Sequence, residues 1–125
     1  MPFFYKIDKE RKLVMSTAAG ELTKADIQLL QDQLREDPDF DPNFSQLSDL
    51  TNATGMNITG ADMQDLAVTT AFSPNARRAV IASNDLAFGL ARIFEQVRET
   101  KGDLGIRVFR KLEDALDWIV KDGSG

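Results

Sequence analysis

Apolar and polar residues alternate near the start of the chain in the manner of two β-strands. Residues 3–7 and 13–18 are rich in aromatic and β-branched side chains, and the charged residues 8–11 between them are typical of a turn. Two short strands joined by a polar turn favour antiparallel pairing. The pattern therefore predicts that the chain opens with a β-hairpin.

Helical periodicity begins after residue 20 and returns three more times. Thr23 and Asp26 stand at the spacing of a capping box ahead of apolar positions 27, 30 and 34, which predicts a helix over 24–36. Thr59 and Asp62 repeat that spacing at the start of a second helix. A third helix is expected after a cap at residues 83–85, with Leu86 on its apolar face, and a closing helix is expected around residues 112–119.

Three further strands are expected between these helices, over residues 45–50, 78–83 and 106–109. Residues 78–83 form a nearly continuous apolar run, which is typical of a central strand buried on both faces. The order of elements predicts an α/β fold in which about four helices cover a mixed β-sheet of about five strands. Residues 1–121 are expected to form a single domain, and residues 122–125 a disordered tail.

The composition restricts the available chemistry. A chain of 125 residues with 42% apolar and 28% charged residues is typical of one ordinary globular domain. The chain has neither cysteine nor histidine, which excludes thiolate nucleophiles, His-dependent triads and metals bound through either residue type. We therefore expect no enzymatic activity, no cofactor and no metal.

Charge and hydropathy bear on partners and location. Fifteen basic and twenty acidic residues give a formal net charge of -5, which repels a phosphate backbone and makes nucleic acid an unexpected partner. No window approaches the roughly eighteen apolar residues of a membrane span, and the first residues lack the pattern of a signal peptide. We therefore expect a cytoplasmic protein with no membrane span.

Three carboxylates at every second position, Asp37, Asp39 and Asp41, match the first ligands of an EF-hand calcium loop. The sixth position of that loop requires glycine and is Pro42 here, and the twelfth requires glutamate and is Ser48. A solvated acidic loop is therefore the favoured interpretation. The chain also contains no glycine-rich phosphate-binding motif.

The segment over 49–60 joins the carboxyl end of a predicted strand to a helix N-terminus, where open α/β sheets usually carry functional residues. A phosphate on Thr59 would be stabilised by the free N–H groups and the dipole of that helix. Thr59 is equally suited to a plain N-cap, worth about 1 kcal/mol. The residues alone favour the plain cap over the switch.

Here the chain resembles a STAS domain, the fold of SpoIIAA-like anti-sigma-factor antagonists. In that family a strand ending in Asp-Leu leads to an Asp-Ser-Ser-Gly motif, and its second serine is the phosphorylated switch. Asp49-Leu50 precedes Asn57-Ile58-Thr59-Gly60 at the matching distance, so the resemblance implies that Thr59 takes the switch position. Residues 87–92 and 108–119 are similar to small bacterial SpoIIAA-like (STAS/SEC14-type) proteins without an assigned biochemical activity.

Two functions are expected. The first is a non-enzymatic regulatory module that docks an unidentified protein partner through Asn57, Ile58, Gly60 and Asp62, switched by phosphorylation of Thr59. The alternative, implied by the SEC14-type resemblance and the apolar face of the third helix, is a carrier of a small apolar ligand or lipid. Its pocket would lie at a helix–sheet edge or at a dimer interface, and a two-fold homodimer is the simplest self-association.

Overall fold

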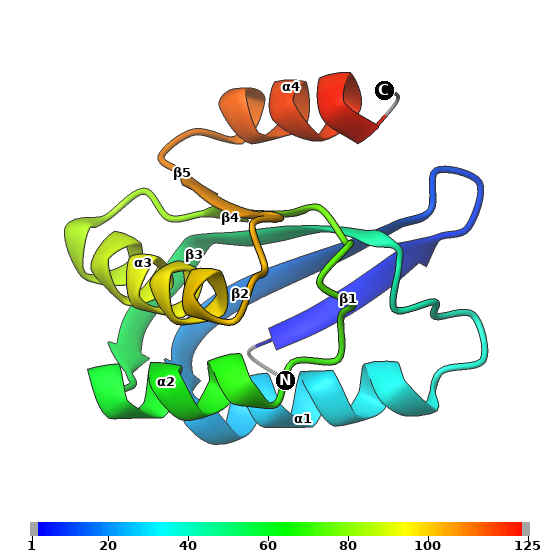
Figure 1. Cartoon of the computed structure of the whole chain (residues 1–125). Coiled ribbons are helices and arrows are strands. Elements are labelled where there is room, and N and C mark those ends of the chain that lie inside the picture. Colours follow the sequence, from blue (N-terminus) through cyan, green and yellow to red (C-terminus); the bar gives the residue numbers. More distant parts are fainter. Residues whose placement is uncertain (1–2, 124–125) are drawn as a thin grey trace.

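The computed structural model describes the backbone of residues 3–123 and the side chains of residues 3–120. Within these residues the chain forms five strands and four helices, arranged as in Figure 1. In chain order they are β1 (Phe3–Asp8), β2 (Leu13–Thr23), α1 (Lys24–Glu36), β3 (Ser45–Asn57), α2 (Gly60–Val68), β4 (Arg78–Ile81), α3 (Asp85–Thr100), β5 (Ile106–Phe109) and α4 (Leu112–Gly123). The tail predicted over 122–125 falls on the end of α4 and on residues 124–125, which lie outside the described residues.

The five strands form one mixed sheet in the order β1-β2-β3-β4-β5. β1 and β2 pair antiparallel, with Phe3 opposite Ala18, and all other neighbouring strands pair in parallel. The predicted α/β fold, a mixed sheet that opens with an antiparallel hairpin and carries four helices, is confirmed. The strand expected to be central, β4, has neighbours on both sides, but β3 takes the middle position.

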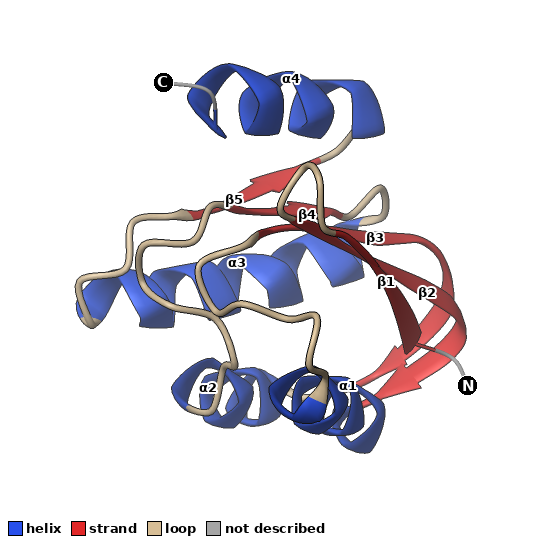
Figure 2. Cartoon of the chain, turned by 90° about the vertical axis from the view of Figure 1, so that its right-hand side faces the viewer, coloured by secondary structure: helices blue, strands red, loops and turns tan. Residues whose placement is uncertain are grey.

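The helices cover the two faces of the sheet unequally (Figure 2). α1, α2 and α3 lie against one face, and α4 lies against the other. The larger apolar core, which includes Leu22 and Leu66, lies between the sheet and the three helices, and a smaller core that includes Ile81 and Ile119 lies under α4. Strands between two covered faces need apolar residues in both directions, which explains the continuous apolar run in β4.

β2 and β3 are both longer than the sequence predicted. They pair in parallel along the added length, from Ala19 opposite Asn52 to Thr23 opposite Asn57, with two register shifts typical of β-bulges. The prediction that residues 49–60 only connect a strand to a helix is therefore wrong for most of that segment, because β3 extends to Asn57. Pairing with β2 satisfies the backbone groups of a segment whose small and polar side chains have little strand preference of their own.

The helix ends follow the predicted chemistry. Thr23 and Asp26 form a capping box at the start of α1, and Asn84 caps α3 by accepting a 2.8 Å hydrogen bond from the amide of Ala87. Gly102 follows the end of α3 with a φ of 87°. The prediction for Leu86 is wrong, since it is 58% exposed. The buried face of α3 starts one residue later and includes Ala87, Leu90, Ala91 and Phe94.

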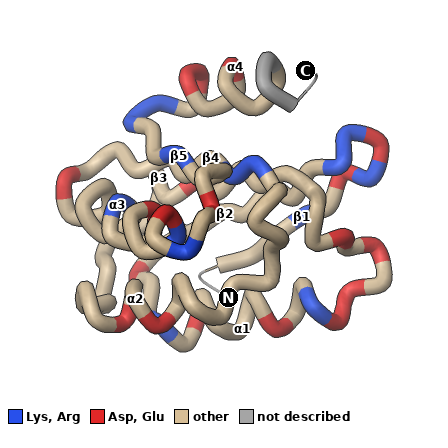
Figure 3. The backbone as a smooth tube through the Cα atoms, viewed as in Figure 1, with Lys and Arg blue, Asp and Glu red and all other residues tan. Residues whose placement is uncertain are grey.

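Charged residues of both signs are spread over the helices and loops (Figure 3). None of the helices in the described part of the chain combines the length and the apolar character needed to cross a membrane.

Candidate functional site

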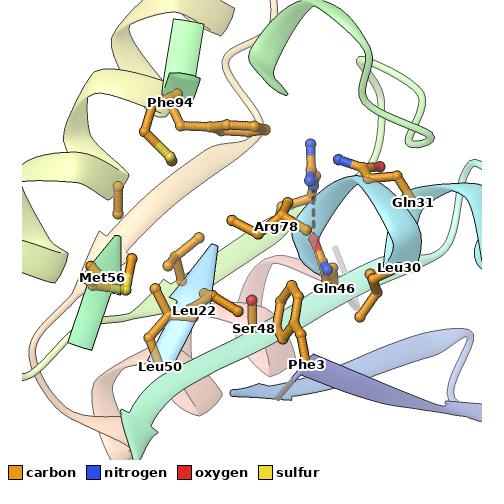
Figure 4. Close-up of a pocket in the computed structure, with 14 residues that line it drawn as sticks. Phe3, Leu22, Leu30, Gln31, Gln46, Ser48, Leu50, Met56, Arg78 and Phe94 are labelled. Atoms are coloured by element: carbon orange, nitrogen blue, oxygen red, sulfur yellow. Dashed lines mark hydrogen bonds between the residues drawn. The ribbon is translucent and has the colours of Figure 1, made fainter. Parts of the chain in front are cut away.

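A pocket lies between the sheet and the layer formed by α1, α2 and α3 (Figure 4). The cavity has a volume of about 70 Å³. Most of the wall is apolar and is built by Phe3, Leu22, Ile27, Leu30, Leu50, Met56, Met63, Val80, Ala91 and Phe94. The polar part of the wall consists of Gln31, Gln46, Ser48 and Arg78.

Strand alternation brings three of these polar residues into the pocket. Gln46 and Ser48 lie two positions apart on β3, and Arg78 lies directly across from Gln46 on β4. The intervening residues Leu47 and Ala79 face the opposite way, into the core under α4. The polar row therefore lies on the face of the sheet that α1, α2 and α3 cover.

Arg78 is 5% exposed and is held from several sides. Its Nε donates a hydrogen bond to Oε1 of Gln46 at 3.0 Å, and its Nη1 donates to Oγ1 of Thr70 at 2.8 Å. The guanidinium carbon lies 4.5 Å from the centre of the Phe72 ring and 5.2 Å from that of Phe94. A guanidinium has five N–H donors and these two bonds use two, so three remain without a partner among the described residues.

Gln46 and Gln31 are each oriented by a second hydrogen bond. Nε2 of Gln46 donates to the buried hydroxyl of Ser16 at 2.9 Å, which leaves its Oε1 for Arg78. Oε1 of Gln31 accepts from the amide of Ala71 at 2.7 Å, which fixes the orientation of the Gln31 amide group. Figure 4 shows the nitrogen of that group turned toward the guanidinium of Arg78.

The unused donors open onto the pocket. No fully enclosed side-chain nitrogen or oxygen in the described part of the chain lacks a hydrogen-bond partner. Gln31 Nε2, the Ser48 hydroxyl and Nη2 of Arg78 have no partner among the described residues, so each keeps some accessible surface, and all three residues line the pocket. This end of the pocket therefore presents hydrogen-bond donors.

The charge at this end is positive. No carboxylate of a described residue lies within ion-pair distance of Arg78, and the nearby Asp103 pairs with Arg98 at 3.2 Å. Burial lowers the pKa of Arg78 to about 9, with Asp103 opposing that change and Arg98 adding to it. The guanidinium stays protonated at neutral pH, and two guanidinium groups with one carboxylate leave one positive charge uncompensated.

The residues predicted around Thr59 occupy different environments. Thr59 is exposed and is the N-cap of α2, where its Oγ1 accepts from the Asp62 amide at 3.1 Å and Oδ2 of Asp62 accepts from the Thr59 amide at 3.0 Å. The hydrogen bond from the Thr59 amide is the main cause that lowers the pKa of Asp62. Asn57 is exposed and Gly60 is half-buried, but Ile58 is 7% exposed and packs in the larger core. The capping box brings Thr59 and Asp62 together, and Ile58 points away from them.

The carboxylates of the acidic loop already bind neighbouring protein groups. Oδ2 of Asp37 accepts from the Tyr5 hydroxyl at 2.7 Å, and Oδ1 of Asp37 and of Asp41 accept from backbone amides two residues ahead. Asp39 forms an exposed ion pair with Lys9 at 3.3 Å. Among the described residues, no group of three ligating side chains is placed to hold a metal ion.

The sequence predicts the pocket of a ligand carrier at a helix–sheet edge or a dimer interface and does not identify the polar residues of this pocket, although two signals point toward them. Gln31 interrupts the apolar stripe formed by Ile27, Leu30 and Leu34 on α1, and Arg78 opens the most apolar strand of the chain. A polar residue on a buried face needs a partner, so each marks a place where polar chemistry enters the core. Neither signal shows that the two residues meet, because α1 and β4 are far apart in sequence.

Comparison with known proteins adds evidence on the fold. Neither the known protein-family models nor the curated protein sequences match this chain. The crystal structure of an uncharacterized DUF3478-family protein from Shewanella loihica PV-4 with a SpoIIAA-like fold is similar to it, with a TM-score of 0.58. The match covers 93% of this chain and 92% of that one at 22% sequence identity, a level that supports the fold alone. With its mixed sheet, opening hairpin and helix order, the chain therefore has a SpoIIAA-like fold.

Proposed function

We propose that this chain binds a small, largely apolar ligand in the pocket under α1, α2 and α3, as a carrier and without catalysing a reaction. The observation that carries the proposal is the pocket itself, with an apolar wall drawn from strands and three helices and polar groups gathered at one end. Such a combination is the usual form of a small-molecule site. Binding of this kind requires no bond to be made or broken.

The size of the pocket restricts the ligand. A space of about 70 Å³ is well below the size of most small-molecule sites, so it excludes a membrane lipid with two acyl chains and admits a short chain only if the wall adjusts. Met56 and Met63 lie in the wall, and their flexible thioether side chains can repack around a guest. We therefore propose a ligand with a short apolar body.

The test is a titration of the purified protein with hexanol, followed through the NMR signals of the Met56 and Met63 methyl groups. Ala91→Leu should fill the pocket from α3 and abolish binding, because Ala91 is 4% exposed and lines the wall. Gln96→Leu is the matched control, since it adds a leucine on the exposed face of the same helix. We expect saturable shifts of the methyl signals in the wild type and in Gln96→Leu, and none in Ala91→Leu. The proposal fails if neither hexanol nor hexanoate shifts these methyl signals in the wild-type protein.

A second candidate function is docking of a protein partner at the start of α2, regulated by phosphorylation of Thr59. The exposure of Thr59 favours it, because an enzyme could reach the hydroxyl. The capping box opposes it, because a phosphate would stand beside the Asp62 carboxylate that accepts from the Thr59 amide. The test compares proteins captured from lysate by wild type, Thr59→Asp and Thr23→Asp, which alters the equivalent half-buried cap of α1. A partner lost only with Thr59→Asp would support the switch, and identical partners for all three would count against it.

A further inference from the structure

We propose that the ligand of this pocket carries a carboxylate, bound between the guanidinium of Arg78 and the side-chain amide nitrogen of Gln31. The inference rests on the proposed ligand-binding function and adds the chemical class of the ligand, a monocarboxylate with a short apolar tail. It follows from the charge, the donor geometry and the shape of the pocket.

Arg78 carries a charge that no described residue compensates. The group is 5% exposed, and its two hydrogen-bond acceptors, Gln46 and Thr70, are both neutral. The rings of Phe72 and Phe94 attract the cation but carry no net charge. A buried charge is costly unless it is paired, so an anion that enters the pocket gains the interaction that the described residues do not supply.

The donors of Gln31 and Arg78 are turned toward each other (Figure 4). The Ala71 amide occupies Oε1 of Gln31, and the Gln31 nitrogen is turned toward the guanidinium (Figure 4). Two donor groups that face each other have no attraction for one another, and both are satisfied if an acceptor lies between them. The Ser48 hydroxyl adds a third donor on the same wall.

A carboxylate matches the polar end of the pocket in charge and in number of acceptors. A carboxylate has two oxygens and one negative charge, and the site presents one uncompensated positive charge with a small set of donors. A phosphate brings up to two charges and three oxygens, more than this site can neutralise. The apolar wall from Leu22 to Phe94 then takes the rest of the ligand, which makes the occupant an amphiphile.

The experiment compares hexanoate, hexanol and acetate by NMR titration of the wild-type protein. Hexanoate should bind at least about tenfold more tightly than hexanol, because its hydrogen bonds are charge-assisted. Acetate should bind more weakly than hexanoate, because it buries little apolar surface. Equal affinity for hexanoate and hexanol would overturn the inference and leave the ligand-binding function standing. Acetate that binds as tightly as hexanoate would overturn the assignment of an apolar tail.

Gln31→Glu is the decisive variant, because it keeps the shape of the side chain and places a carboxylate opposite Arg78. Oε1 can still accept from the Ala71 amide, and the new oxygen replaces the Nε2 donor proposed to bind the ligand with a negatively charged acceptor. We expect hexanoate binding to fall at least about tenfold while hexanol binding and folding are kept. Unchanged hexanoate affinity in Gln31→Glu would refute the proposed position of the carboxylate.

Arg78→Met removes the charge at similar volume and should abolish the preference for hexanoate over hexanol. The matched control is Arg11→Met, which removes the same charge from the exposed turn between β1 and β2, where Arg11 pairs with Asp8. It should keep the wild-type preference. If both Arg→Met variants lose the preference equally, the general charge of the protein and not Arg78 selects the anion, and the inference is wrong.

Discussion

Arg98 and Asp103 form an ion pair that is almost fully buried, with side-chain exposures of 10% and 1%. Arg98 also donates to the carbonyl of Ala67, and Asp103 accepts from the Gly105 amide. Asp103→Asn keeps the shape and the bond from Gly105 but leaves the arginine charge unpaired, so we expect a loss of about 3 kcal/mol in the free energy of unfolding. Urea denaturation measures it. Asp39→Asn, which breaks the exposed pair with Lys9, should cost less than about 1 kcal/mol, and equal losses in both variants would contradict the argument.

Tyr5 is the single tyrosine of the chain, so ultraviolet titration of phenolate absorbance reports this residue alone. Burial raises its pKa to about 12, assisted by the hydrogen bond to Asp37 and by the charge of that carboxylate. The protonated form is favoured in the folded state, so the stability it contributes is present below the ordinary pKa of about 10 and is lost as the pH rises toward 12. Asp37→Ala should lower the titration midpoint. An unchanged midpoint would assign the whole shift to burial.

Two helices begin with the same device, a threonine cap whose aspartate partner stands three residues later. Thr23→Ala and Thr59→Ala should each cost about 1 kcal/mol, because each removes the acceptor for one free amide of the first turn. The serine variants should stay near wild type, because serine supplies the same oxygen. Thermal or urea unfolding measures both series. A loss for Thr59→Ala far below that for Thr23→Ala would show that α2 does not depend on its cap.

Helix starts were predictable because capping is local, with donor, acceptor and helix within a few residues. The end of β3 was not, because residues such as Thr54 and Gly55 indicate a turn when only their neighbours are considered. They form strand because β2 provides hydrogen-bond partners from thirty or so residues earlier in the chain. Thr59 could therefore be placed at a helix start from sequence, but not two residues past the end of a long strand.

The polar end of the pocket depends on the same kind of long-range contact. Gln31 comes from a helix, and Gln46 and Arg78 come from neighbouring strands, so their meeting follows from strand order and register. Each residue stood out from its apolar surroundings in the sequence, which marked it as unusual. Only the fold shows that the amide of Gln31 and the guanidinium of Arg78 face the same space.

The molecule as a whole has two cores of unequal size on the two faces of one sheet. α4 buries Ala115 and Ile119 in the smaller core, and its Leu112, Leu116 and Val120 remain exposed. α3 buries a longer face against a larger core and also contacts α2. Since local opening costs least where the least apolar surface is buried, α4 should open at a lower free energy than α3.

Native-state hydrogen exchange tests this difference amide by amide. In the wild type, amides of α4 should exchange through an opening of lower free energy than amides of α3. Ile119→Ala should speed exchange mainly in α4, because the lost contacts lie in the smaller core. Leu66→Ala, at a fully buried position of α2, should lower the global stability by about 2–5 kcal/mol and speed every amide that exchanges by global unfolding. If Ile119→Ala instead lowers the protection of α3 and α4 equally, the two cores unfold as one unit, and α4 contributes to the free energy of global unfolding.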